Sequence, residues 1–194
     1  MSEFWMYLEI GMEHILDRQG YDHIMFVVAL CALYMVSDMK KLLILVTSFT
    51  IGHSITLALA TFRVINVNSD LVEFLIPVTI FMTAFSNILS RTDKFGRSKM
   101  QTNYFLALFF GLIHGLGFSN YLRAILGKDQ SIITQLFAFN IGIEAGQIIL
   151  VAIYLASVFI FVDIFRVNRR DWRIIISAAI AGIALTMVAE AKYW

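Results

Sequence analysis

Several uninterrupted apolar runs of close to 20 residues constrain this chain more than any other feature of its sequence. A helix needs about 20 apolar residues to cross the hydrocarbon core of a bilayer, which is about 30 Å thick. Charged residues make up 15% of the chain, against about 25% in a soluble domain. The runs also lack the alternation of apolar and polar residues that a transmembrane barrel requires. The sequence therefore predicts an all-α, polytopic helix bundle embedded in a lipid bilayer.

Charged and turn-forming residues divide the apolar runs into six predicted transmembrane helices, all within a single integral membrane domain (1–194). The predicted spans are residues 22–37, 41–62, 71–89, 102–122, 132–161 and 172–190. The segment before them, residues 1–20, carries apolar and acidic residues at helical spacing. It is too short and too charged to span a bilayer, so it is predicted to form a short interfacial helix.

The basic residues gather on one side of this predicted topology. Ten of the 15 lie in or beside the loops that follow the first, third and fifth spans: Lys40, Lys41, Arg91, Lys94, Arg97, Lys99, Arg166, Arg169, Arg170 and Arg173. Because basic loops stay in the cytoplasm, both termini are predicted to lie outside, on the periplasmic or exterior side of the membrane. The net charge of +1 gives no indication of nucleic-acid binding.

The four histidines of the chain all lie inside or beside the apolar runs. His14, Asp22 and His23 precede or open the first span, so they are predicted to lie at the outer surface. His53 and His114 are predicted to lie roughly 18 Å along the second and fourth spans, near mid-membrane. Imidazole and carboxylate groups at the mouth of an apolar bundle indicate a transition-metal site. The alternatives are a helix N-cap at the membrane surface and hydrogen bonds between helices.

Glu144 adds a carboxylate at a comparable depth in the fifth span. An ionised carboxylate at the membrane centre costs about 2.5–3.5 kcal/mol, so Glu144 needs a cation, a histidine or a proton. Asn140 and Gln147 share its helix face at i, i+4, i+7 spacing, and Ser54 and Asn87 add polar groups on other spans. These side chains are predicted to line a cavity, or else to join helices by hydrogen bonds.

A set of motifs between residues 11 and 147 extends this pattern. In chain order they are GMEHILDRQGYDHIMF (11–26), TSFTIGHSITL (47–57), Val72–Glu73 followed by Asn87, FGLIHGLGF (110–118) and NIGIEAGQ (140–147). Together they resemble the HupE/UreJ family of bacterial integral membrane proteins. The resemblance implies a nickel or cobalt permease. It also implies metal-binding roles for the motif residues His14, Asp22, His23, His53, His114 and Glu144.

Three functions fit these residues, one of which is a metal-bound structural or sensory subunit. The first is a transporter for a divalent transition metal, in which the outer histidines capture the ion and pass it to the mid-membrane group. Mixed nitrogen and oxygen ligands suit Ni²⁺, Co²⁺ or Zn²⁺, although affinity order alone would favour Cu²⁺. The alternative is an intramembrane metal-dependent hydrolase, whose His-ligated metal activates water while Ser54, Asn87 or Asn140 holds a substrate carbonyl. A homo-oligomer is left open as a further partner.

Overall fold

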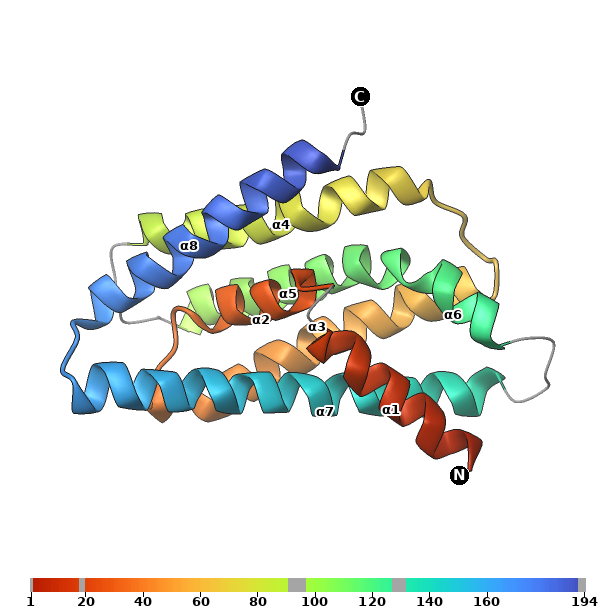
Figure 1. The fold of residues 1–194 in the computed structure, drawn as a ribbon, viewed down its shortest axis with the longest axis horizontal. Helices are drawn as coiled ribbons and strands as arrows, with labels where there is room; N and C mark the ends of the chain where they lie inside the picture. Colours follow the sequence, from red (N-terminus) through yellow and green to blue (C-terminus); the bar gives the residue numbers. More distant parts are fainter. Residues whose placement is uncertain (1, 18–19, 91–96, 127–131, 192–194) are drawn as a thin grey trace.

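The computed structural model describes residues 2–17, 20–90, 97–126 and 132–191 (Figure 1). Most of the predicted basic loop at 91–99 lies outside these ranges. The described residues form helices joined by short turns. The elements are α1 (Glu3–Leu16), α2 (Asp22–Cys31), η1 (Val36–Asp38), α3 (Met39–Thr61), α4 (Ser69–Leu89), α5 (Arg97–Gly117), α6 (Ser119–Leu126), α7 (Ile132–Val158), η2 (Phe159–Ile164) and α8 (Arg169–Glu190).

Within the described residues, four helical segments are long and apolar enough to cross a membrane. They are Val36–Thr61, Ser69–Leu89, Ile132–Ile164 and Arg169–Glu190. They match the second, third, fifth and sixth predicted spans, and the longest consists of α7 continued by a π-helical turn, η2. The all-helical prediction is confirmed, and length and composition support four of the six predicted spans.

The first predicted span, residues 22–37, is wrong in length. α2 has ten residues and ends at Cys31, so it is about 15 Å long, half the thickness of a bilayer core. The chain then turns inside the bundle, where Tyr34 is 1% exposed and accepts a hydrogen bond from Asn103. Hydropathy reports burial and not helicity, so a buried apolar turn has the same signature as the end of a helix.

The fourth predicted span, residues 102–122, is also wrong at its end. α5 finishes at Gly117, and a separate short helix, α6, begins at Ser119. Apolar residues continue through the junction because Phe118 and Leu122 pack into the core. As with α2, the apolar run therefore continues past the point where the helix ends.

α1, predicted to lie at the membrane surface, packs closely along the first half of α7. A Cβ atom on Gly11 would overlap the carbonyl oxygen of Phe139, and one on Gly142 would overlap that of Leu8. Small residues at a crossing let two backbones approach this closely. Ile15 is fully buried in the same contact. The acidic residues of α1 lie mostly on its other faces, which explains why its composition reads as interfacial.

α1 and α2 follow one another along the long axis of the bundle, and the chain breaks between them near the middle (Figure 1). α1 and α7 run in one direction, and α3 and α5 run side by side in the other. α4 and α8 pack together along one side of the bundle, and α4 also contacts α2 and α5. The break between α1 and α2 is thus surrounded by longer helices.

A glycine substitution tests the close crossing of α1 and α7. Gly142→Ala is expected to destabilise the protein by about 1–3 kcal/mol, because the added Cβ forces the two backbones apart. Gly182→Ala on α8 is the control, since no atom lies within 4 Å of its new Cβ; it should stabilise by about 0.5–1 kcal/mol. Thermal unfolding of the purified proteins in one detergent measures both effects. A midpoint for Gly142→Ala at or above that of the unsubstituted protein would contradict the crossing.

Candidate metal centre

The four histidines meet at the break between α1 and α2. Ring centroids are separated by 4.4 Å for His14–His23, 5.9 Å for His23–His53 and 5.4 Å for His23–His114. His53 and His114 are 0% exposed and His23 is 4% exposed. Imidazoles from α1, α2, α3 and α5 therefore share one buried space.

This arrangement corrects the predicted depth of the N-terminal residues. Asp22 and His23 do not lie at the outer surface, because the His23 ring lies 5.9 Å from that of His53, inside the bundle. The reason is the short length of α1 and α2. Each covers only part of the bundle, so the residues at their junction reach the same level as His53 and His114. The histidines predicted at two depths instead form a single cluster.

Two overlapping groups of side chains in the described chain could each hold a metal ion. One group is His14, His23 and His53, and the other is Asp22, His23 and His114. In each group, one ligand atom from every member lies within 4.8 Å of the others. Because His23 belongs to both groups, they are adjacent positions of one centre.

A carboxylate fixes the proton on His23. The Asp22 Oδ1 atom lies 3.2 Å from His23 Nδ1, and an ionised carboxylate only accepts hydrogen bonds. The proton therefore belongs on Nδ1, which leaves the lone pair of Nε2 free. His23 Nε2 is buried and has no hydrogen-bond partner among the described residues. Metal-bound histidines commonly donate their second ring N–H to a carboxylate in this way.

A threonine fixes the proton on His114. The Thr79 hydroxyl donates to the carbonyl of Ile76 at 2.7 Å, and its oxygen lies 3.1 Å from His114 Nε2. Since the hydroxyl proton is already used, Nε2–H donates to Thr79, and Nδ1 keeps its lone pair. His114 Nδ1 is likewise buried without a partner in the described chain. Thr79 is a site residue that hydropathy and residue type did not single out.

The remaining imidazoles present further unpaired nitrogen atoms. Both ring nitrogens of His53, and Nε2 of His14, are buried without a hydrogen-bond partner among the described residues. Buried polar atoms are nearly always hydrogen-bonded, so such a group of exceptions calls for a ligand. His14 also lies in the last turn of α1, where the helix dipole favours a cation. The cluster is therefore a candidate centre for a positively charged metal ion.

Glu144 lies outside both metal-binding groups. Its carboxylate accepts a hydrogen bond from the hydroxyl of Thr47 on α3. Thr47 precedes His53 by nearly two helical turns, or about 9 Å along the axis. The second carboxylate oxygen of Glu144 is buried without a partner in the described residues. The structure thus places the acidic side chain beside the histidine cluster along α3 and not within it.

The four predicted lining residues serve mainly in contacts of the helices. The Ser54 hydroxyl donates within α3, and the Asn87 amide donates to a backbone carbonyl of α2 at 2.7 Å. Gln147 accepts from the hydroxyl of Thr50 at 2.8 Å, joining α7 to α3. Asn140 keeps a buried carbonyl oxygen without a partner among the described residues. Three of these side chains therefore make hydrogen bonds within or between helices, which was the alternative to a cavity lining.

Phenylalanine rings cover the cluster on two sides. Phe118 lies against His14 at 3.8 Å between centroids, and Phe26 lies against His114 at 4.7 Å. Phe139 packs on Phe118 and Phe49 on Phe26, and each also lies beside a histidine of the cluster. Phenylalanine is common in apolar runs, so residue type alone gave no signal for this shell.

The fold and the site together define a helical membrane protein with a buried candidate metal centre. The family model of the HupE / UreJ protein matches residues 1–192, and the chain therefore belongs to this family. The family is associated with nickel and cobalt transport. A search of curated proteins and a search of solved structures each found no match.

Thr79 gives a direct test of the arrangement around His114. Thr79→Val keeps the side-chain shape but removes the oxygen that accepts from His114 Nε2, and it is expected to weaken metal binding about 10–100-fold. Thr83→Val, one turn later on α4, is the control, because the Thr83 hydroxyl donates within its own helix. Equilibrium titration of the purified proteins with Ni²⁺ or Co²⁺ compares the affinities. Equal losses in the two variants would contradict the assigned role of Thr79.

Proposed function

We propose that this protein binds a divalent transition metal ion, Ni²⁺ or Co²⁺ in the first place and Zn²⁺ as a further candidate, and carries it across the bacterial inner membrane. The observation that carries the proposal is the convergence of four imidazoles whose ring nitrogens are buried and largely unpaired. Imidazole suits all three ions. Membership of a family associated with nickel and cobalt transport adds independent support.

The break between α1 and α2 supports a transporter. Together α1 and α2 contain the length of one crossing, and we propose that they form the first of six crossings. α5 forms another, alongside the four apolar segments. Transporters often bind their ions near mid-membrane, where broken helices direct backbone groups and side chains toward the site. The end of α1, with His14, and the start of α2, with Asp22 and His23, meet in this way.

Charge balance gives Glu144 a place in this proposal. A divalent ion at the neutral imidazoles meets one carboxylate, Asp22, which leaves a net positive charge in an apolar bundle. Such charge is costly far from water. Glu144 lies beside the cluster along α3, so we propose that it balances the second charge and is the next ligand on the ion's route. The ion would thus move between the histidines and Glu144 without carrying a full net charge through the bundle.

Metal binding by His53 tests the proposed function. Loss of the hydrogen-bond partner of a metal ligand lowers metal affinity roughly 10–100-fold. His53→Ala removes a proposed ligand itself, so it is expected to lower the affinity for Ni²⁺ by more than this. It is also expected to abolish uptake of radioactive Ni²⁺ by cells. Ile55→Ala, on the exposed side of the same helix, should match the unsubstituted protein. Glu144→Gln should slow uptake more than it weakens equilibrium binding. Unchanged metal content in His53→Ala would remove the basis of the proposal.

Cysteine labelling tests the orientation. In a Cys31→Ala background, which removes the chain's single cysteine, Asn66→Cys should react with an impermeant thiol reagent in intact spheroplasts. Ser37→Cys should react only after the membrane is opened, because it precedes the basic pair Lys40 and Lys41 and basic loops stay in the cytoplasm. Both side chains are exposed, Ser37 in η1 and Asn66 in the connection between α3 and α4. The reverse pattern would show that the proposed orientation is wrong.

A further inference from the structure

The two halves of the chain repeat one another in sequence. Three short motifs occur in each half: GxxHxL at 11–16 and 111–116, FxIG at 49–52 and 139–142, and FRV at 62–64 and 165–167. The motifs keep one order if the unit α1–α4 is compared with the unit α5–α8. Each is weak alone, and their agreement in order calls for a structural comparison of the two units.

The turns that contain FRV have the same backbone conformation. Arg63 has a φ of 58° and Arg166 a φ of 57°, and they are the non-glycine residues with positive φ in the described chain. Asn68 and Asn168 then begin the next helix in the same manner, each accepting a hydrogen bond from the backbone N–H two residues later. The turns that precede α4 and α8 are therefore equivalent.

The closest helix pairs are also equivalent, since α1 packs on α7 as α5 packs on α3. An added Cβ would overlap a backbone carbonyl at matching positions of the two pairs. A Cβ on Gly11 would overlap the carbonyl of Phe139, and one on Gly111 that of Phe49. Likewise, a Cβ on Gly142 would overlap the carbonyl of Leu8, and one on Gly52 that of Leu108. Both pairs therefore cross at the same motif positions. Because these contacts join one unit to the other, the repeat is a feature of the fold and not only of the sequence.

The two units run in opposite directions. α1 and α7 proceed from the end of the bundle where α1 begins, whereas α3 and α5 proceed toward that end (Figure 1). The repeat is therefore inverted along the long axis. In transporters built from inverted repeats, the ion site lies between the repeats and opens to the two sides of the membrane in turn. Here His14 and His114 occupy matching positions of the two units, on either side of His23.

Each of these two histidines lies against a phenylalanine ring at the same inclination. The rings of Phe118 and His14 are inclined by 40°, as are those of Phe26 and His114. Phe118 directly precedes α6, which follows α5, and Phe26 lies in α2, which follows α1, so each ring comes from the short-helix region that follows the other histidine's helix. The inverted repeat therefore places one ring on each side of the metal centre.

The two rings separate the centre from two different spaces. Phe118 and His14 line an open recess together with Glu13, Asp17 and Tyr121. α6, which carries Tyr121, lies toward the end of the bundle where α1 begins (Figure 1). The carboxylates there would attract a cation. His14 is the member of the cluster that lines this recess, and the Phe118 ring lies against it.

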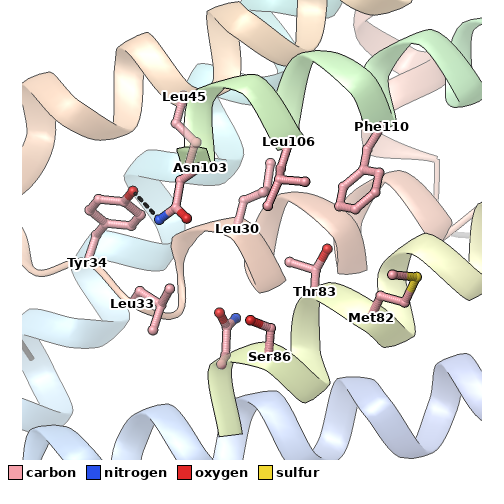
Figure 2. Close-up of a pocket in the computed structure, with 11 residues that line it drawn as sticks. Leu30, Leu33, Tyr34, Leu45, Met82, Thr83, Ser86, Asn103, Leu106 and Phe110 are labelled. Atoms are coloured by element: carbon pink, nitrogen blue, oxygen red, sulfur yellow. Dashed lines mark hydrogen bonds between the residues drawn. The ribbon is translucent and has the colours of Figure 1, made fainter. Parts of the chain in front are cut away.

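On the opposite side, Phe26 contacts Phe110, and Phe110 lines a cavity of about 210 Å³. Figure 2 shows this cavity among α2, α3, α4 and α5, with the hydroxyl of Tyr34 and the amide of Asn103 joined by a hydrogen bond at one end and Ser86 facing the space. Its walls are mainly apolar, but these side chains supply neutral oxygen atoms. The space is large enough for several water molecules.

We infer that Phe118 and Phe26 are the two gates of the metal centre, Phe118 toward the side on which α1 begins and Phe26 toward the opposite side. The inference rests on the proposed function and adds to it the route and the residues that control it. When one ring moves aside, the ion exchanges through the acidic recess. When the other moves, it exchanges through the cavity beside Tyr34 and Asn103. The equivalence of the two units makes the two movements alternatives of the same kind.

The test measures exchange of bound Ni²⁺ with each face separately. Right-side-out and inside-out membrane vesicles are loaded with radioactive Ni²⁺, and its release to external EDTA, which does not cross the membrane, is followed. Phe118→Leu should speed release several-fold at the face on which α1 begins and leave the other face unchanged. Phe26→Leu should give the opposite pattern. Phe105→Leu, on the exposed side of α5, should change neither rate. Leucine keeps most of the buried volume, and Ni²⁺ content at equilibrium reports an intact centre.

The outcomes separate this inference from the proposed function. If the unsubstituted protein retains no more Ni²⁺ than His53→Ala, the proposed function fails, and the gates fail with it. If it retains Ni²⁺ but both gate variants speed release at the same face, or neither changes either rate, the inference alone is overturned. Phe118→Ala and Phe26→Ala remove the rings entirely and serve as a second pair of variants. The inference is overturned when this pair also fails to speed release at opposite faces. Opposite-sided effects in either pair support the inference.

Discussion

The close contact between backbones in two helix pairs is the interaction on which the rest of this structure depends. Gly11 and Gly142 bring α1 against α7, and Gly52 and Gly111 bring α3 against α5. His14 follows Gly11 by less than one turn, and His53 follows Gly52 directly. A larger residue at these crossings would separate the backbones and carry the imidazoles apart. The geometry of the metal centre is therefore set by packing and only secondarily by the histidines themselves.

The centre combines an apolar surrounding with unusually many unpaired nitrogen atoms. In a low-dielectric bundle each unpaired buried polar atom costs free energy, and a cation that binds several of them removes that cost. Asp22 and Thr79 hold two of the rings so that their free lone pairs point away from the hydrogen bonds. Such fixed orientation reduces the reorganisation that binding requires. Together these contacts explain how one site could be both buried and selective for nitrogen-binding metal ions.

The inverted repeat is the structural basis of the proposed movement at this site. α1 and α7 form one pair and α5 and α3 form its counterpart, with the centre between the pairs and a phenylalanine on each side. Two equivalent arrangements of the same sequence elements have similar free energies, so a modest change at one side can exchange them. α4 and α8 pack on one another. Each follows an equivalent turn and is the last helix of its unit. The architecture thus suits a protein that opens alternately to two faces.

The sequence by itself determined the all-helical class, four of the apolar spans, the family and which imidazoles were candidate ligands, because apolar length and residue chemistry are local properties. The internal motifs were also present in the sequence, although each is too short to distinguish a repeat from chance. Only the tertiary structure decided that α2 stops at Cys31, that Asp22 and His23 lie level with His53, and that Glu144 pairs with Thr47. Hydropathy measures how apolar a segment is and not where a helix breaks, and depth counted along one helix ignores the tilt and packing of its neighbours. Those depend on contacts between residues far apart in the chain.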